Sequence, residues 1–291
     1  MQKNYGKISL TSVFCARMRK KQGIPFSREL IELIDTKYKE NIEDLPDYGK
    51  SLNEVSDFIP FIEGRYYSIN KALEPLKNVM IIEIAAGLSP RSLNFLKRED
   101  VIYVETELPE LIKIKEKIIK DIIKNKKLMA KMNIRFLSLN PLNKKEIDKI
   151  GETYKKVGTG KRMVIIHEGL LMYFTREEKS RFRDNIKYLF ENYAKDGMWI
   201  TTDLSRLKKT SGVKGKENIR KEISKVTQRE FDYFESEEEV KQFLDEGGFN
   251  FKILSNKEMI DELIKKKNLE AKRKEIIESS REYRVYMIQL N

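Results

Sequence analysis

A glycine and a glutamate twenty residues apart stand where a nucleotide-like ligand could bind. Gly87 lies in IIEIAAGLSPRSL, which runs from an apolar strand pattern through a turn of small residues toward a helix. Glu107 lies in VETELPE, at the end of the next apolar run. Small residues at such a turn let a ligand approach the backbone, and an acid at the second strand end can accept hydrogen bonds from a ribose diol. A purely structural tight turn followed by a solvent-exposed acid would have the same sequence pattern. The pattern therefore favours nucleotide binding without requiring it.

Two more acids and a histidine occupy comparable places. Glu83 and Glu105 lie in the same two apolar runs, and Glu83 either caps the turn or contacts a ligand there. His167 is the only histidine of the chain and ends the apolar run MVIIH. One imidazole is too few for a two-histidine zinc site, so His167 is either a structural residue of the pocket or a general base.

These residues can meet only if the chain alternates strands and helices. Apolar runs suited to strands occur at residues 78–84, 101–105, 134–139, 163–167, 198–202, 249–254 and 283–290. Most are almost continuously apolar, as strands buried on both faces of a parallel sheet are. An amphipathic helix is expected over 109–127, and Thr175 with Glu178 and Ser236 with Glu239 have the spacing of capping boxes. The pattern predicts an α/β, Rossmann-like fold with a seven-stranded, mostly parallel sheet and helices on both faces.

Three segments depart from this alternation. Residues 1–76 are expected to form a helical N-terminal cap, and residues 77–291 the α/β core. Within the core, residues 205–235 resemble an inserted lid, and residues 256–282 a charged helical insert. Residues 205–229 hold nine Lys or Arg against two acidic residues. Such a segment suits a nucleic-acid contact, a funnel for an acidic substrate or a solvated surface.

The composition excludes several classes of protein. The 291 residues include 58 Lys and Arg against 46 Asp and Glu, a net charge of +12. No apolar stretch reaches the roughly 20 residues that span a bilayer, and the N-terminus lacks a secretory-signal pattern. The single cysteine, Cys15, excludes an internal disulfide and a multi-cysteine metal site. We therefore expect a cytoplasmic protein with metal-free chemistry and no membrane partner.

Five blocks of the sequence resemble, in order, those of a known family. They are ISLTSVFCARMRKKQGIPFSREL, FIEGRYYSINKAL, EIAAGLSPRSL, VETELPELIKIK and IHEGLLMYFTREE. Together they resemble the S-adenosylmethionine-dependent O-methyltransferases related to leucine carboxyl methyltransferase, which include the polyketide carboxyl methyltransferases. The last block, which matches a Glu-Gly-x-x-x-Tyr pattern, is the most specific. The resemblance extends over nearly the whole chain and implies a class I methyltransferase fold that binds S-adenosyl-L-methionine.

The resemblance also implies roles for individual residues. Arg65, with Arg17 as a second candidate, would neutralise the methionine carboxylate of the cofactor, and Gly87 would let its backbone approach. Glu107 would hold the ribose hydroxyls and Asn140 would stand at the adenine. The chain departs from the family here, because Glu107 stands where the family usually has aspartate, and Asn140 and Asn143 where it tends to have aspartates.

The remaining candidates concern the reacting end of the site. By the same resemblance, Glu168 and Tyr173 would close the pocket around the sulfonium and the substrate, and Glu83 and Glu105 complete the cofactor-binding candidates. Tyr173 and His167 are the catalytic candidates. A carboxylate acceptor has a pKa near 4 and arrives ionised, so it needs no base. A hydroxyl acceptor would need one, and His167 is the obvious choice.

The most favoured function is thus O-methylation of a carboxylate in a small-molecule or peptide acid. A tRNA-modifying methyltransferase is the alternative within the class, because the basic segments could meet phosphates. A non-catalytic nucleotide-binding or nucleic-acid-binding protein with the same fold is the alternative outside it, because a fold does not specify a function.

Overall fold

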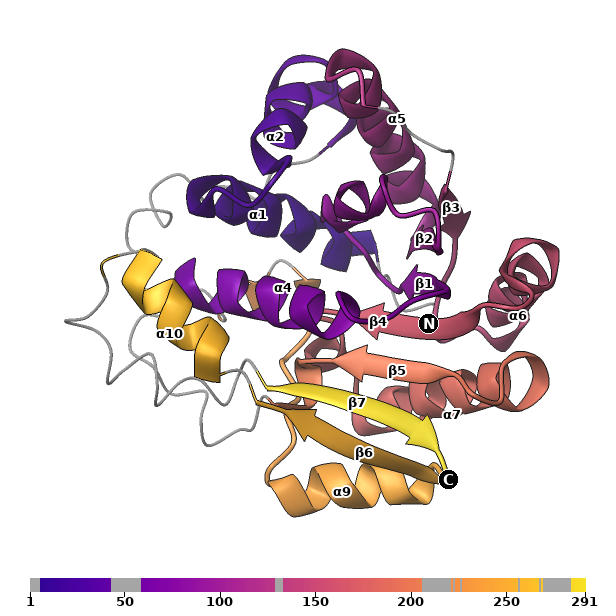
Figure 1. The fold of residues 1–291 in the computed structure, drawn as a ribbon. Coiled ribbons are helices and arrows are strands. Elements are labelled where there is room, and N and C mark those ends of the chain that lie inside the picture. The colour runs from indigo at the N-terminus through magenta and orange to yellow at the C-terminus, as the bar shows by residue number, and fades with distance from the viewer. Residues whose placement is uncertain are drawn as a thin grey trace.

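The computed structural model describes residues 6–42, 59–128, 133–205, 221, 223–225, 227–255, 257–266, 268 and 284–291. Its centre is a seven-stranded sheet in the order β3-β2-β1-β4-β5-β7-β6 (Figure 1). All neighbouring strands are parallel except those that pair with β7, which runs antiparallel to β5 and to β6. The strands are β1 (Val79–Glu83), β2 (Val101–Glu107), β3 (Ile134–Ser138), β4 (Arg162–His167), β5 (Met198–Thr201), β6 (Phe249–Leu254) and β7 (Val285–Leu290).

Helices cover both faces of this sheet because both faces are apolar. Successive strand residues point to opposite faces. Met80 and Ile82 of β1 accordingly pack in a core with the helices of one side, α6 (Lys144–Thr153), α7 (Arg176–Tyr193) and α9 (Glu237–Glu246). Val79 and Ile81 pack in a second core with α4 (Ile59–Leu73).

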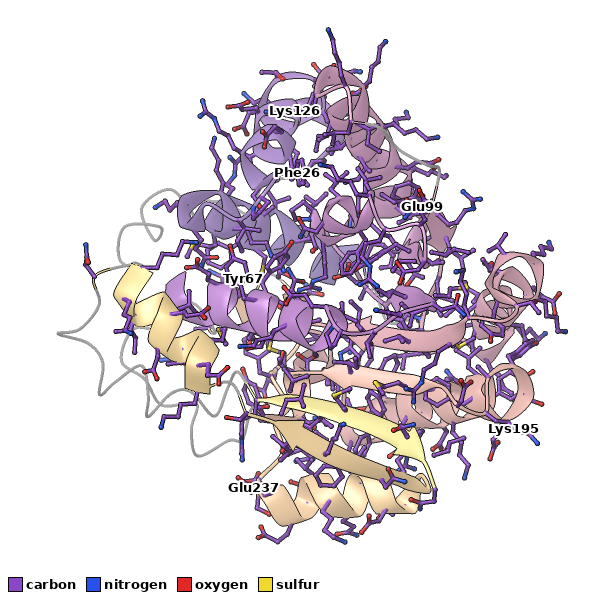
Figure 2. The ribbon with its side chains drawn as sticks, viewed as in Figure 1. Phe26, Tyr67, Glu99, Lys126, Lys195 and Glu237 are labelled. Carbon is purple, nitrogen blue, oxygen red and sulfur yellow. The ribbon has the colours of Figure 1, made fainter. Side chains whose placement is uncertain are left out.

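The other helices build outward from α4 and from the β2 side of the sheet. α5 (Pro109–Asn125) contacts β2 and β3, and α2 (Ser27–Thr36) packs on α5. α1 (Gly6–Gln22) contacts both α2 and α4, and α10 (Lys257–Lys266) packs on α4. Short helical turns complete the order: η1 (Lys39–Asn41), η3 (Arg91–Phe95), η4 (Tyr154–Gly158), η5 (Leu171–Tyr173) and η6 (Asp203–Ser205). Charged side chains such as Lys126, Lys195 and Glu237 lie at the periphery (Figure 2).

The strand order determines where a ligand can enter. From β1 the chain moves outward to β2 and β3, then returns to the other side of β1 for β4 and β5. The loops after β1 and β4 therefore diverge at neighbouring strand ends, and a crevice forms at such a reversal point. The candidate site residues Gly87, Glu107 and Glu168 lie at or just after the ends of these strands.

The seven-stranded, mostly parallel sheet with helices on both faces confirms the predicted fold class. Thr175 and Glu178 form the predicted capping box of α7. The second predicted box is only half formed, because Ser236 accepts from the Glu239 backbone N–H, but the Glu239 carboxylate accepts from the Glu235 backbone N–H. The helix expected after Gly87 is the short 3-10 helix η3, because few residues separate this turn from β2.

The proposed division into cap, core, lid and insert stays a prediction. Residues 206–220 of the proposed lid and 269–283 of the proposed insert lie outside the described residues. Among the helices that are described, none is both long and apolar enough to cross a membrane.

Candidate functional site

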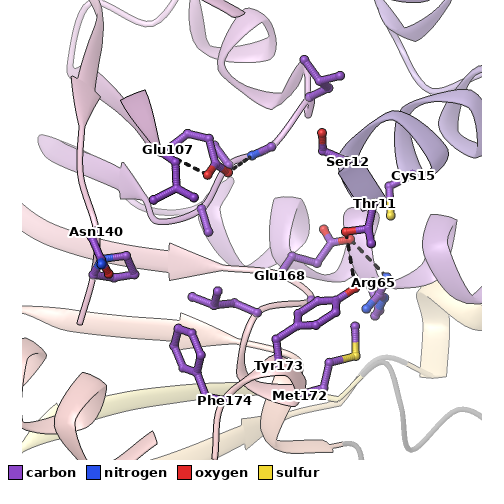
Figure 3. A pocket seen from close by; sticks show the side chains of 18 of the residues that line it. Thr11, Ser12, Cys15, Arg65, Glu107, Asn140, Glu168, Met172, Tyr173 and Phe174 are labelled. Atoms are coloured by element: carbon purple, nitrogen blue, oxygen red, sulfur yellow. Dashed lines mark hydrogen bonds and ion pairs between the residues drawn. The ribbon is translucent and has the colours of Figure 1, made fainter. Parts of the chain in front are cut away.

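A pocket lies at the carboxyl ends of β1, β2, β3 and β4, under the N-terminal helices (Figure 3). It encloses about 880 Å³ of space, which includes its opening to solvent. Figure 3 shows Glu107 and Asn140 on one side of the pocket, and Glu168, Arg65 and Tyr173 on the other. The lining residues are Thr11, Ser12, Cys15, Arg19, Arg65, Ala85, Ala86, Gly87, Leu88, Glu107, Leu108, Asn140, Pro141, Glu168, Gly169, Leu170, Met172, Tyr173 and Phe174.

The turn after β1 brings backbone, rather than side chains, to the pocket. Ala85 has φ +52° and Gly87 φ +50°, a conformation that costs an L-residue about 1 kcal/mol or more. The Ala86 N–H donates to the Thr106 carbonyl at 2.9 Å, and Lys115 Nζ donates to the Ala86 carbonyl at 3.3 Å. These bonds hold the turn in its strained form.

Gly87 is required by both its conformation and its surroundings. A Cβ at this position would lie 3.1 Å from Ser12 Cβ of α1, whereas a Cβ at Gly23, which also has positive φ, would meet nothing within 4 Å. We expect Gly23→Ala to lower the free energy of unfolding by about 1 kcal/mol from backbone strain alone. Gly87→Ala should lower it by about 1 kcal/mol more and narrow the pocket. Urea denaturation of the two variants measures the difference, and equal losses would contradict a steric role for Gly87.

Glu107 is held at the end of β2 by backbone donors. Its two carboxylate oxygens accept the Leu108 N–H at 2.8 Å and the Gly87 N–H at 3.0 Å. Burial raises the pKa of Glu107 above its ordinary value, although these two hydrogen bonds act to lower it. Each oxygen keeps capacity for a further donor, because a carboxylate has about four acceptor sites. This side of the pocket can therefore accept hydrogen bonds from a pair of hydroxyls.

The opposite side of the pocket is lined by two guanidinium groups and one carboxylate. Glu168 Oε1 lies 3.2 Å from Arg19 Nη2 and 3.7 Å from Arg65 Nη2, and its Oε2 lies 2.6 Å from Arg91 Nη2. Burial by itself would raise the pKa of Glu168, but the charges of Arg19, Arg91 and Arg65 outweigh it and lower that pKa. The carboxylate therefore stays ionised, and the arrangement can bind a group that carries both charges.

Arg17 does not belong to this cluster, which corrects one sequence-based candidate. Arg17 pairs with Asp35 of α2 at 2.8 Å and does not line the pocket. Arg19 occupies the position in the pocket that was expected for Arg17. Residues i and i+2 of an α-helix are separated by about 200° around the axis, so Arg17 and Arg19 point in nearly opposite directions. The block that contains both arginines pointed to α1, but only the packing of α1 on α4 shows which of them faces inward.

Glu83 and Glu105 are buried beside the pocket rather than in its lining. They are register neighbours on β1 and β2, and Glu105 pairs with Lys115 of α5 at 2.7 Å. Glu83 pairs with Arg91 and accepts a hydrogen bond from the Tyr103 hydroxyl at 2.7 Å. Burial raises the pKa of Glu105 despite the opposing charge of Lys115. Both acids lie within the sheet and act on neighbouring side chains, so the structure does not support direct contact with a cofactor.

His167 lies in the core behind the pocket. It is fully buried, its ring packs edge-to-face on Phe182 with centroids 5.2 Å apart, and it does not line the pocket. Its Nδ1 lies 2.9 Å from Asp203 Oδ2. His167 is therefore not in position to act as a base, and its structural alternative fits the geometry. The apolar character of β4 around it was the signal for that alternative.

Tyr173 and Asn140 do line the pocket. The Tyr173 hydroxyl donates to Thr11 Oγ1 at 3.4 Å. The backbone carbonyl of Tyr173 accepts a hydrogen bond from Arg229 Nη1 at 2.8 Å. Asn140 Oδ1 accepts the Leu142 N–H at 3.0 Å, which stabilises the loop after β3. Sequence reasoning missed Arg19, which lines the pocket, and Arg91, which pairs with Glu168 from behind it, since nothing in their local pattern marks an arginine as buried.

Solved structures described as methyltransferases are similar to this chain in fold. Protein-family profiles and curated protein sequences contain no match to the chain. Among solved structures, a putative methyltransferase from Thermobifida fusca is similar at 10% identity and a TM-score of 0.53, over 84% of this chain and 85% of that one. Two further structures are similar at a lower level. Human N-acetylserotonin methyltransferase in complex with SAM has a TM-score of 0.48 and 10% identity over 96% of this chain. PigF with SAH has a TM-score of 0.47 and 13% identity over 80% of this chain.

At these identities the similarity shows the fold alone. The chain spans 65% of the N-acetylserotonin methyltransferase chain and 55% of the PigF chain. The comparisons do not establish the leucine carboxyl methyltransferase family that the sequence blocks resemble.

Proposed function

We propose that the protein is an S-adenosylmethionine-dependent O-methyltransferase that methylates a carboxylate of a small-molecule or peptide acid. The observation that carries the proposal is the charge arrangement of one pocket. Glu107 lies beside the Gly87 turn on one side, and Arg19, Arg65 and Glu168 lie on the other. The cofactor has the matching groups, a ribose diol at one point and a zwitterionic amino acid at another.

Each part of the cofactor would be bound by its own set of pocket residues. Glu107 would accept the ribose hydroxyls, and the strained Gly87 turn, where a Cβ would meet Ser12, leaves room for backbone approach. Arg19 and Arg65 would bind the carboxylate of the amino acid, and the ionised Glu168 its ammonium group. Asn140, Pro141 and Phe174 would surround the adenine.

When bound, S-adenosylmethionine supplies an activated methyl group on a positively charged sulfur. The protein's task is then to hold an acceptor oxygen in line with that methyl group and to exclude water. Met172 and Tyr173 line the part of the pocket near Glu168 and would close it around the acceptor. No pocket residue is required to remove a proton when the acceptor is a carboxylate, which agrees with the burial of His167 away from the pocket.

Calorimetry tests the proposal directly. We expect S-adenosylmethionine and S-adenosylhomocysteine to bind, and NAD⁺ not to bind, because only one glycine stands where dinucleotide sites carry three. Turnover is then tested with a set of carboxylic acids. Binding of NAD⁺ without binding of either S-adenosyl compound would refute the proposed function.

The salt dependence of binding separates the alternatives. Affinity for tRNA should fall steeply with ionic strength, because phosphate contacts release counterions. Affinity for a zwitterionic cofactor should change little. A protein that binds S-adenosyl compounds and also methylates tRNA would shift the proposed acceptor from an acid to a nucleic acid.

A further inference from the structure

Arg91 joins two carboxylates that belong to different parts of the protein. It follows the Gly87 turn in η3, and its side chain is fully buried. Nη1 lies 2.5 Å from Glu83 Oε1 on β1, and Nη2 lies 2.6 Å from Glu168 Oε2 after β4. Arg91 itself does not line the pocket.

Two residues of α4 contact the remaining edge and one face of this guanidinium. Arg91 Nε donates to Asn70 Oδ1 at 2.9 Å, and the guanidinium carbon lies 4.5 Å from the centroid of the Tyr66 ring. The Tyr66 hydroxyl in turn accepts a hydrogen bond from Asn94 Nδ2 at 2.8 Å. The guanidinium plane is thereby held by contacts from β1, α4 and the segment after β4.

We propose that Arg91 is a positioning residue that orients the Glu168 carboxylate in the pocket from behind. This inference rests on the proposed function, in which Glu168 pairs with the ammonium group of the amino acid moiety. One oxygen of Glu168 is directed toward Arg91, so the other can face Arg19, Arg65 and the ligand. Lysine could not do the same, since an ammonium group is a point charge without the planar fork.

The same contact has a consequence without any ligand. The charged groups that face Glu168 are Arg19 from α1, Arg65 from α4 and Arg91 from η3, and together they lower its pKa. Removing the Arg91 charge should raise the pKa of Glu168, whereas replacing arginine by lysine keeps the charge and removes the fork. Charge and orientation can therefore be separated.

The experiment uses Arg91→Lys, Arg91→Met and Glu83→Gln, with Arg98→Lys as the matched control. Arg98 follows η3 and bonds Asp100 and the Leu76 carbonyl away from the pocket. Calorimetry with S-adenosylhomocysteine should show a Kd increased on the order of tenfold in Arg91→Lys, as expected for the loss of a charge-assisted hydrogen bond. Glu83→Gln should raise the Kd by about threefold through Arg91, since Glu83 itself lies outside the pocket lining. Arg98→Lys should bind as the parent protein does.

A second measurement does not depend on the ligand. Carbon-13 NMR of the Glu168 carboxyl, titrated in the unliganded protein, should give a higher pKa in Arg91→Met than in the parent and no change in Arg98→Lys. If the parent binds no S-adenosyl compound, the proposed function fails, while the titration still tests the contact between Arg91 and Glu168. Parent-like binding by both Arg91→Lys and Glu83→Gln, while Glu168→Gln loses binding, would overturn the positioning role. If Arg91→Met does not fold, parent-like binding of S-adenosylhomocysteine by Arg91→Lys and Glu83→Gln still overturns the positioning role.

Discussion

Replacing Asp203 by alanine is expected to lower the free energy of unfolding by about 3–5 kcal/mol. This carboxylate is buried at the start of η6, just after β5, and accepts from the backbone N–H groups of Gly169, Leu170 and Leu171 at 2.7, 2.7 and 3.0 Å. It also contacts His167 Nδ1 at 2.9 Å. Without it, three backbone donors and the imidazole lose their common acceptor in a buried place.

Urea denaturation measures the loss, and Asp245→Ala is the matched control. The Asp245 side chain is 52% exposed and pairs only with a surface lysine of its own helix, Lys241, among the described ion pairs, so its removal should change stability little. Asp203→Asn keeps one carbonyl oxygen, so its free energy of unfolding should lie between that of Asp203→Ala and that of the parent. Equal denaturation midpoints for Asp203→Ala and Asp245→Ala would show that Asp203 does not hold the turn after β4.

The stabilisation by Asp203 should also depend on pH with a defined sign. Burial alone would raise the pKa of Asp203, but the interaction with His167 and the backbone hydrogen bonds lower it well below its ordinary value. A lowered pKa in the folded state gives stability that is present above the ordinary aspartate pKa and is lost as pH falls toward the folded pKa. The difference in stability between the parent and Asp203→Ala should thus shrink below about pH 4.

Glu107→Ala is expected to weaken S-adenosylhomocysteine binding by about 10- to 100-fold, which corresponds to about 1.4–2.8 kcal/mol. The variant removes the acceptor proposed for the ribose and leaves the Gly87 and Leu108 N–H groups without it. Calorimetry measures the change. Glu110→Ala, an exposed acid in the first turn of α5, is the control.

The pH dependence of binding distinguishes Glu107 from Glu168. The pKa of Glu107 is raised and that of Glu168 is lowered, so acidification should protonate Glu107 first. Ribose hydroxyls that donate to an ionised carboxylate should then bind less well as pH falls through this raised pKa. Glu107→Gln should lose that dependence. An identical pH profile in the parent and in Glu107→Gln would place the ribose elsewhere.

The sequence by itself determined the architecture and the outline of the site. Continuous apolar runs such as MVIIH favour strands buried on both faces, and their alternation with amphipathic helices predicts the observed sheet. Gly87 and Glu107 could be selected because strand ends and turns are local features. The distance along the chain between them reflects one strand–helix–strand repeat.

The tertiary structure alone decided which charged residues face the pocket. Arg17 and Arg19 are two residues apart and chemically equivalent, yet only the packing of α1 directs Arg19 to Glu168 and Arg17 to Asp35. Glu105 and Glu107 are two residues apart on β2 and point to the same face of the sheet, yet Lys115 of α5 pairs with the first and leaves the second at the strand end. His167 is at a strand end in the sequence, but Asp203, thirty-six residues later, holds its ring in the core. Side-chain direction at a strand end or on a helix depends on what packs there, and those partners are distant in the chain.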